Sequence, residues 1–93
     1  MINDIDFILR NNLKSIRSRL GITQLALAQE IGVQKSYCSR LERGEFIPNI
    51  KLCLLIHRAL INIYFQRTGK LLEKLTIDRL FYIEEQKQPQ DQC

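Results

Sequence analysis

Residues 34 to 40 include side chains that can hydrogen bond to the edges of planar heterocyclic bases. They are Gln34, Lys35, Ser36, Tyr37 and Arg40. Lysine and arginine can donate to O6 and N7 of guanine, glutamine can pair with N6 and N7 of adenine, and ring surface can contact the methyl group of thymine. The sequence has no recognisable paired carboxylates, nucleophile with its base, or glycine-rich phosphate loop. This chemistry favours recognition of DNA over catalysis, so we expect no enzyme.

The basic residues that would support such recognition are unevenly distributed. The net charge is +4, but the segment from residue 10 to residue 43 contains seven bases and two acids, a balance of +5. The rest of the chain carries seven bases and eight acids, a balance of −1. A basic segment favours an anionic partner such as nucleic acid.

The cysteines offer no metal site. Cys38, Cys53 and Cys93 include no CxxC pair, and His57 is the only histidine. We therefore expect no metal and no cofactor, and we interpret Cys38 and Cys53 as small buried apolar residues.

Two short helices joined by a tight turn would position the candidate donors. Thr23 can cap a helix over residues 24–31, Gly32 permits the positive φ of a turn, and a second helix over residues 35–43 follows. Where two such helices cross, a small residue must stand at the contact, and Ala28 meets this need. The surrounding apolar positions are Leu27, Ile31, Val33, Cys38 and Leu41.

From about residue 11 to residue 60 the sequence resembles the Cro/CI-type (Xre-like) helix-turn-helix regulators. The segments that carry the resemblance are TQLALAQEIGV, SRLERG and the PN before a fourth helix. The resemblance implies a lambda-repressor-like fold in which the helix over residues 35–43 enters the major groove and Arg17 pairs with Glu42 as a structural ion pair. The base-reading residues would then be Gln34, Lys35, Ser36, Tyr37 and Arg40, and the phosphate-binding residues would be Gln24, Arg43, Asn49 and Ile50.

The sequence departs from the family pattern at two positions. Gln34 stands where a serine or threonine commonly caps the helix, which would free its side chain for bases. Cys38 stands where isoleucine or valine is usual, which leaves a smaller side chain in the junction. Neither departure removes the fold.

The flanking segments also have helical periodicity. Asn3 can cap a first helix over residues 3–19, with an apolar stripe at Ile5, Leu9, Leu13, Ile16 and Leu20. A fourth helix begins after Pro48 and Asn49, and its apolar surface is wider than one buried stripe. The surplus residues, which we interpret as a dimer interface, are Leu54, Leu55, Ile61, Tyr64 and Phe65.

The carboxy-terminal part allows two interpretations. Leucine and isoleucine spacing over residues 70–86 predicts a last helix capped by Thr76, and LTIDRLF at residues 75–81 looks like the family's fifth helix displaced downstream. The alternative is a hairpin, with strands at residues 61–66 and 71–77. Residues 88–93 are polar and are expected to be disordered.

These observations predict an all-α protein, with a five-helix DNA-binding domain and a C-terminal helical extension. The predicted domain covers residues 1–69, and a dimerising extension covers residues 70–87. We expect a cytoplasmic transcriptional regulator without a membrane segment, which binds double-stranded DNA as a homodimer and represses from a palindromic operator. One alternative is an antitoxin-like protein that neutralises a toxin-like protein partner and regulates its own operon. Another is a helical interaction module without DNA binding.

Overall fold

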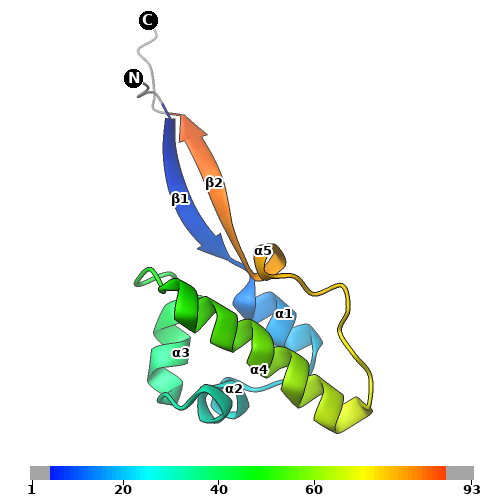
Figure 1. Cartoon of the computed structure of the whole chain (residues 1–93). Coiled ribbons are helices and arrows are strands. Elements are labelled where there is room, and N and C mark those ends of the chain that lie inside the picture. Colours follow the sequence, from blue (N-terminus) through cyan, green and yellow to red (C-terminus); the bar gives the residue numbers. More distant parts are fainter. Residues whose placement is uncertain (1–4, 88–93) are drawn as a thin grey trace, which may run out of the picture.

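The computed structural model describes residues 5–87, with side chains from residue 6 to residue 86. Five helices form a body from which a two-stranded ribbon projects (Figure 1). In chain order the elements are β1 (Ile5–Asn11), α1 (Leu13–Arg19), α2 (Gln24–Ile31), α3 (Lys35–Glu42), α4 (Ile50–Thr68), α5 (Ile77–Leu80) and β2 (Phe81–Lys87). None of the described helices is long and apolar enough to cross a membrane.

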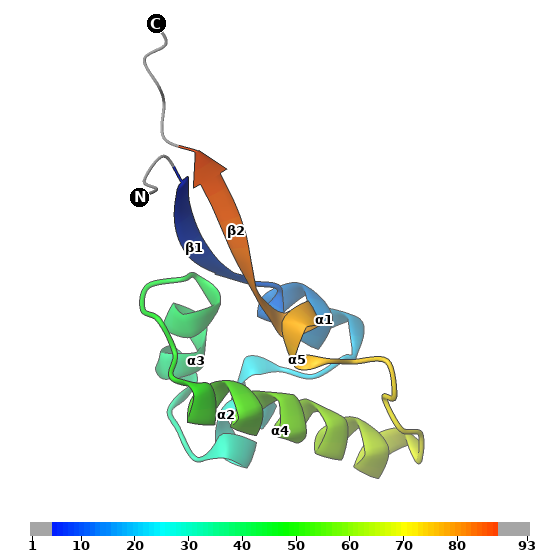
Figure 2. The ribbon, with the colours of Figure 1, turned by 45° about the horizontal axis from the view of Figure 1, so that its top comes forward.

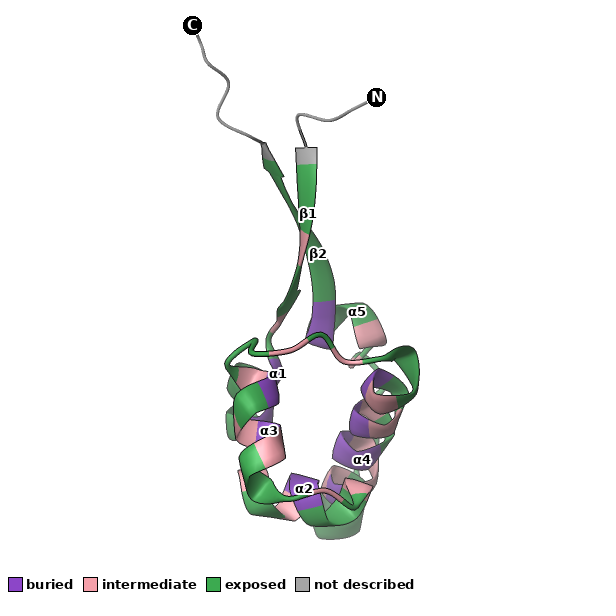
Figure 3. Ribbon diagram, turned by 90° about the vertical axis from the view of Figure 1, so that its left-hand side faces the viewer, coloured by how far each residue is buried: buried purple, intermediate pink, exposed green. Residues whose placement is uncertain are grey.

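The core lies where α1, α2, α3 and α4 face one another (Figure 3). Each helix contributes apolar residues at helical spacing, so that one side of it is removed from water. The side chains with 1% exposure or less include Leu13, Ile22, Leu27, Leu41, Ile56, Leu60 and Leu80. Leu80 belongs to α5, so the carboxy-terminal segment shares the core of the other helices.

The predicted helix pair and the helical character of the fourth segment are confirmed. The hydroxyl of Thr23 accepts a hydrogen bond from the amide of Ala26 at 3.0 Å and caps α2. Gly32, at φ +80°, ends α2 in the left-handed conformation that glycine adopts at little cost. The fourth helix, α4, continues through residue 68 and ends at Gly69, so the alternative hairpin over residues 61–77 is wrong.

The predicted helix over residues 3–19 is wrong in its first half, and Asn3 lies outside the described residues. Residues 5–11 form β1, and α1 begins only at Leu13. The side chain of Asn11 accepts a hydrogen bond from the amide of Leu13 at 3.1 Å, where the strand gives way to the helix. The apolar pattern was compatible with both structures, because apolar residues stand at every second position (Ile5, Phe7 and Leu9) as well as at helical spacing.

The C-terminal helical extension is also corrected. Only residues 77–80 are helical, and residues 81–87 form β2, which pairs antiparallel with β1. In the register, Asn11 lies opposite Phe81, Leu9 opposite Ile83 and Phe7 opposite Glu85. The fold is therefore mostly helical with a two-stranded sheet, rather than all-α. The tail over residues 88–93 lies outside the described residues.

Hydrogen bonds join the ribbon to the body at its base. The side-chain nitrogen of Asn11 donates to the carbonyl oxygen of Leu41 at the end of α3, at 3.1 Å. The backbone amide of Asn12 donates to the carbonyl oxygen of Leu80 at 2.9 Å. Figure 2 shows the strands leaving the body beside α1 and α5. These contacts fix where the ribbon starts relative to the end of α3.

Candidate nucleic-acid interface

The junction of α2 and α3 is closely packed. Ala28 of α2 and Cys38 of α3 are fully buried, and Leu41 is 1% exposed. Burial raises the pKa of the Cys38 thiol, and the nearby carboxylate of Glu42 raises it further. The thiol is therefore a neutral core group, as the sequence predicts.

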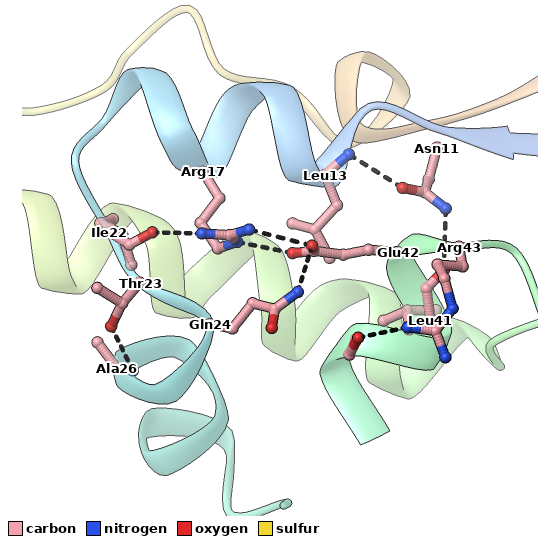
Figure 4. A network of polar contacts seen from close by, with 11 residues as sticks. Asn11, Leu13, Arg17, Ile22, Thr23, Gln24, Ala26, Leu41, Glu42 and Arg43 are labelled. Carbon is pink, nitrogen blue, oxygen red and sulfur yellow. Dashed lines mark hydrogen bonds and ion pairs between the residues drawn. The ribbon is translucent and has the colours of Figure 1, made fainter. Parts of the chain in front are cut away.

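A network of polar contacts behind this junction holds α1, α2 and α3 together (Figure 4). Nε of Arg17 donates to Glu42 at 2.7 Å and Nη2 donates to the second carboxylate oxygen at 3.1 Å. Nη1 of Arg17 donates to the carbonyl oxygen of Ile22 at 2.9 Å. The Arg17 and Glu42 side chains are only 10% and 2% exposed. The structure thus brings together the two residues that the resemblance assigns to a structural pair.

Gln24, which the resemblance assigns to phosphate binding, takes part in the same network. Its side-chain nitrogen donates to Glu42 at 2.8 Å, and the residue is partly buried. A primary amide has a second N–H, so Gln24 can still donate to an anion. The contact with Glu42 fixes the direction from which it would do so.

The start of α3 points its polar side chains away from the core. Gln34, Lys35 and Ser36 are exposed. Gln34 is the N-cap residue of α3, but its side chain makes no capping hydrogen bond. Its amide is therefore not committed to the helix end, as we expected from its departure from the family pattern.

Tyr37 and Arg40 lie in a cluster that the sequence analysis did not find. The ring of Tyr37 packs on Phe46 with centroids 4.8 Å apart, and the guanidinium carbon of Arg40 lies 5.8 Å from the centre of the same ring. Nε of Arg40 lies 3.6 Å from Glu45, and Nε of Arg43 lies 2.7 Å from it. Phe46 therefore contacts both Tyr37 and Arg40, and the carboxylate of Glu45 lies beside both Arg40 and Arg43. An aromatic residue two positions after the helix-ending Gly44 was the available signal.

The start of α4 presents backbone amides next to this cluster along the chain. The side chain of Asn49 accepts a hydrogen bond from the amide of Leu52 at 2.8 Å and so caps the helix. Ile50 and Lys51 are exposed, and the first amides of an α-helix have no acceptor within the helix. Such amides, with the positive end of the helix dipole, can bind a phosphate.

The predicted interface residues of α4 fall on different sides of the helix. Each residue turns the helix by about 100°, which places Leu54, Ile61 and Phe65 opposite the buried Ile56. Leu54 and Phe65 are 52% and 48% exposed. We call Leu54, Ile61 and Phe65 the α4 stripe. The other predicted interface residues, Leu55 and Tyr64, are partly buried on its flanks.

Comparison with known proteins agrees with this architecture. Residues 13–61 match the helix-turn-helix family. The helix-turn-helix regulator YgzD of Bacillus subtilis, described as uncharacterised, is 31% identical over 51 residues, which are 55% of this chain and 77% of that protein. Two regulators of the same description from Archaeoglobus fulgidus are 32% and 34% identical over 50 residues, 54% of this chain and 71% and 70% of those proteins. No solved structure matches the chain.

The fold and the exposed start of α3 define a DNA-binding protein of the helix-turn-helix class. The chain belongs to the Cro/CI-type (Xre-like) helix-turn-helix family, so the predicted family is confirmed. The matched residues end before α5 and begin after β1, so the ribbon lies outside them.

Proposed function

We propose that this protein is a transcriptional repressor that binds a palindromic DNA operator as a homodimer in the cytoplasm. Each copy inserts the start of α3 into the major groove, where Gln34, Lys35, Ser36, Tyr37 and Arg40 read base edges. The two half-sites then lie about one helical turn, roughly 34 Å, apart. Repression follows when the bound dimer blocks access of polymerase to the promoter.

The main support is that the polar side chains at the start of α3 are exposed, next to the tightly packed junction of α2 and α3. Gln34 also makes no capping hydrogen bond. Because the junction fixes the direction of α3, these side chains are held on one face of the body. Gln24 and Arg43, with the amides of Asn49 and Ile50, are the proposed phosphate contacts that set the register of α3 on the duplex.

Selection of bound sites from random duplex DNA, followed by footprinting, tests the proposal. We expect a symmetric sequence with two half-sites one turn apart. Lys35→Ala should weaken binding to the selected site about tenfold or more, because one lost base contact is worth about 1 to 3 kcal/mol. Lys70→Ala is the matched control. This exposed lysine follows α4, a helix of 19 residues that stands between it and α3 in the chain.

Three outcomes would contradict the proposal. One is that no sequence is enriched, and another is that the enriched sites lack symmetry. The third is that Lys35→Ala and Lys70→Ala weaken binding equally at unchanged helicity, which would mean that the start of α3 is not the reading surface.

The α4 stripe supports a second candidate function, in which the protein is antitoxin-like and neutralises a protein partner. Leu54 and Phe65 expose about half of their side-chain surface, and exposed apolar surface of this kind marks protein interfaces. Purification of the chain after expression together with its neighbouring genes would test this candidate. A protein that copurifies with the wild-type chain in stoichiometric amount and is lost in Leu54→Asp would support this candidate. The candidate would be contradicted if no protein copurifies, or if Leu54→Asp retains it.

A further inference from the structure

The ribbon has an unpaired edge on each side among the described residues, because β1 and β2 pair only with each other. It also carries exposed apolar side chains. Leu9 and Ile83 are paired across the ribbon, and Phe7 lies on the same face, since residues two apart on a strand share a face. Their exposed fractions are 61% for Phe7, 37% for Leu9 and 66% for Ile83. A two-stranded ribbon of this kind is marginally stable in water without further strands.

DNA is not the natural partner of the ribbon. The two strands together contain three acids, Asp6, Glu84 and Glu85, against two bases, Arg10 and Lys87. Binding to phosphates requires an excess of positive charge. The ribbon thus exposes Phe7, Leu9 and Ile83 on one face and is slightly acidic overall, which favours another protein surface as its partner.

The order of residues in β1 makes that strand complementary to a second copy of itself. In an antiparallel pair related by a two-fold axis, one residue must face its own copy, because neighbouring residues point to opposite faces. If Ile8 is that residue, Phe7 lies opposite Leu9 of the second copy, and Asp6 lies opposite Arg10 of the second copy. The pairing then has three apolar contacts, counting that of Ile8 with its own copy, and two opposite-charge contacts.

The other possible registers lack this combination. An axis through Asp6 or Arg10 places like charges together, and an axis through Phe7 or Leu9 brings a charged side chain opposite Ile8. Like charges directly opposite each other destabilise a sheet, whereas apolar and opposite-charge pairs stabilise it. Only the register centred on Ile8 therefore satisfies every residue from 6 to 10.

The edge formed by β2 is unsuited to the same pairing. Glu84 and Glu85 are consecutive and exposed, so an axis through either of them places a glutamate opposite its own copy. Charged residues on an edge strand are a common protection against association.

We propose that two copies of this chain associate through β1, in the register centred on Ile8, to form a four-stranded antiparallel sheet. The inference rests on the proposed homodimer and names its interface. Arg10 already contacts Glu84 at 2.7 Å within its own chain, and its remaining N–H groups can reach Asp6 of the second copy. A strand edge of five residues buries less surface than a standard interface, so we expect the dimer in free solution at high protein concentration.

Sedimentation velocity of the full chain over a range of concentrations, without DNA, tests this register. Asp6→Arg should raise the dimer dissociation constant roughly tenfold, because two opposite-charge pairs become two like-charge pairs. Arg10→Asp should have the same effect. An equimolar mixture of the two variants should associate again, since position 6 of each variant then faces the opposite charge at position 10 of the other. Glu73→Arg, an equal charge change on an exposed loop residue, is the control.

The outcomes separate this inference from the proposed function. Wild-type chain that stays monomeric, Asp6→Arg that associates like the wild type, or a mixture that does not recover would each overturn the β1 interface. None of these results affects the Lys35→Ala test of DNA reading. Circular dichroism of each variant verifies that the helical body is intact.

Discussion

The buried ion pair between Arg17 and Glu42 gives the sharpest test of how this fold is held together. In Glu42→Gln the volume is conserved, but the Arg17 charge remains in a site where its side chain is only 10% exposed. Removal of one partner from a buried pair typically costs about 3 to 5 kcal/mol. Small domains unfold with about 5 to 15 kcal/mol, so the variant should lose a large part of its stability. Urea unfolding followed by circular dichroism measures this loss.

Glu45→Gln is the matched control for this experiment. Glu45 also contacts an arginine Nε at 2.7 Å, but the Arg43 and Glu45 side chains are 57% and 44% exposed. An exposed pair contributes about 0 to 1 kcal/mol. All variants should be compared at one protein concentration. If Glu42→Gln costs no more than Glu45→Gln, burial does not determine the strength of the Arg17 contact. Arg17→Met combined with Glu42→Gln should cost less than the sum of the single changes, because no buried charge is then left unpaired.

Three further predictions follow from local contacts. Glu45→Gln should tighten DNA binding and steepen its salt dependence, because Arg40 and Arg43 lose a carboxylate that competes with phosphate. Fluorescence anisotropy titrations at several salt concentrations measure this, and an unchanged slope of log affinity against log salt would refute it. Asn49→Ala should lower the free energy of unfolding by about 1 kcal/mol, as loss of a helix cap does, and Asn49→Asp should restore it while weakening DNA binding. Burial raises the pKa of Cys38 above its ordinary value of 9.0. The stability that the buried, neutral Cys38 thiol contributes is present below this ordinary pKa and is lost as the pH rises through the raised pKa of the folded state. The free energy of unfolding should therefore fall less between about pH 8 and about pH 10 in Cys38→Ala than in the wild type.

The sequence was sufficient where structure depends on near neighbours. Thr23, Gly32 and Ala28 lie within one helix pair, and each has a local physical requirement that its residue type meets. The boundaries of α2 and α3 therefore agreed with prediction to within one residue. The family assignment rests on the same local segment.

The strands could not be derived in this way, because their partners are distant in sequence. Nothing near Leu9 indicates that it will pair with Ile83. An apolar residue every third or fourth position predicted a helix, but the deciding contact is a backbone pairing that local periodicity does not contain. The run Phe81, Tyr82, Ile83 was the missed indication, since aromatic and β-branched residues favour strands.

The candidate site was predictable as a set of residues but not as an arrangement. The residue types at the start of α3 indicate hydrogen-bond donors, yet they do not reveal that Tyr37 and Arg40 share contact with Phe46. That contact depends on the path of the turn after α3, which the residue pattern leaves open. The DNA-reading roles of these side chains stay a prediction until the variants are measured.

The pairing of β1 with β2 also determines at which stage of translation the fold can be completed. β1 leaves the ribosome before the helices α1 to α5, whereas β2, which completes the ribbon, emerges after them. The helices, whose contacts are local, can assemble while Phe7 and Leu9 are still without a neighbouring strand. In that interval the unpaired β1 of one nascent chain can pair with β1 of another nascent chain on the same messenger RNA. Closely spaced ribosomes would therefore promote pairing between sister chains, and slow translation of the last codons would prolong the risk of aggregation.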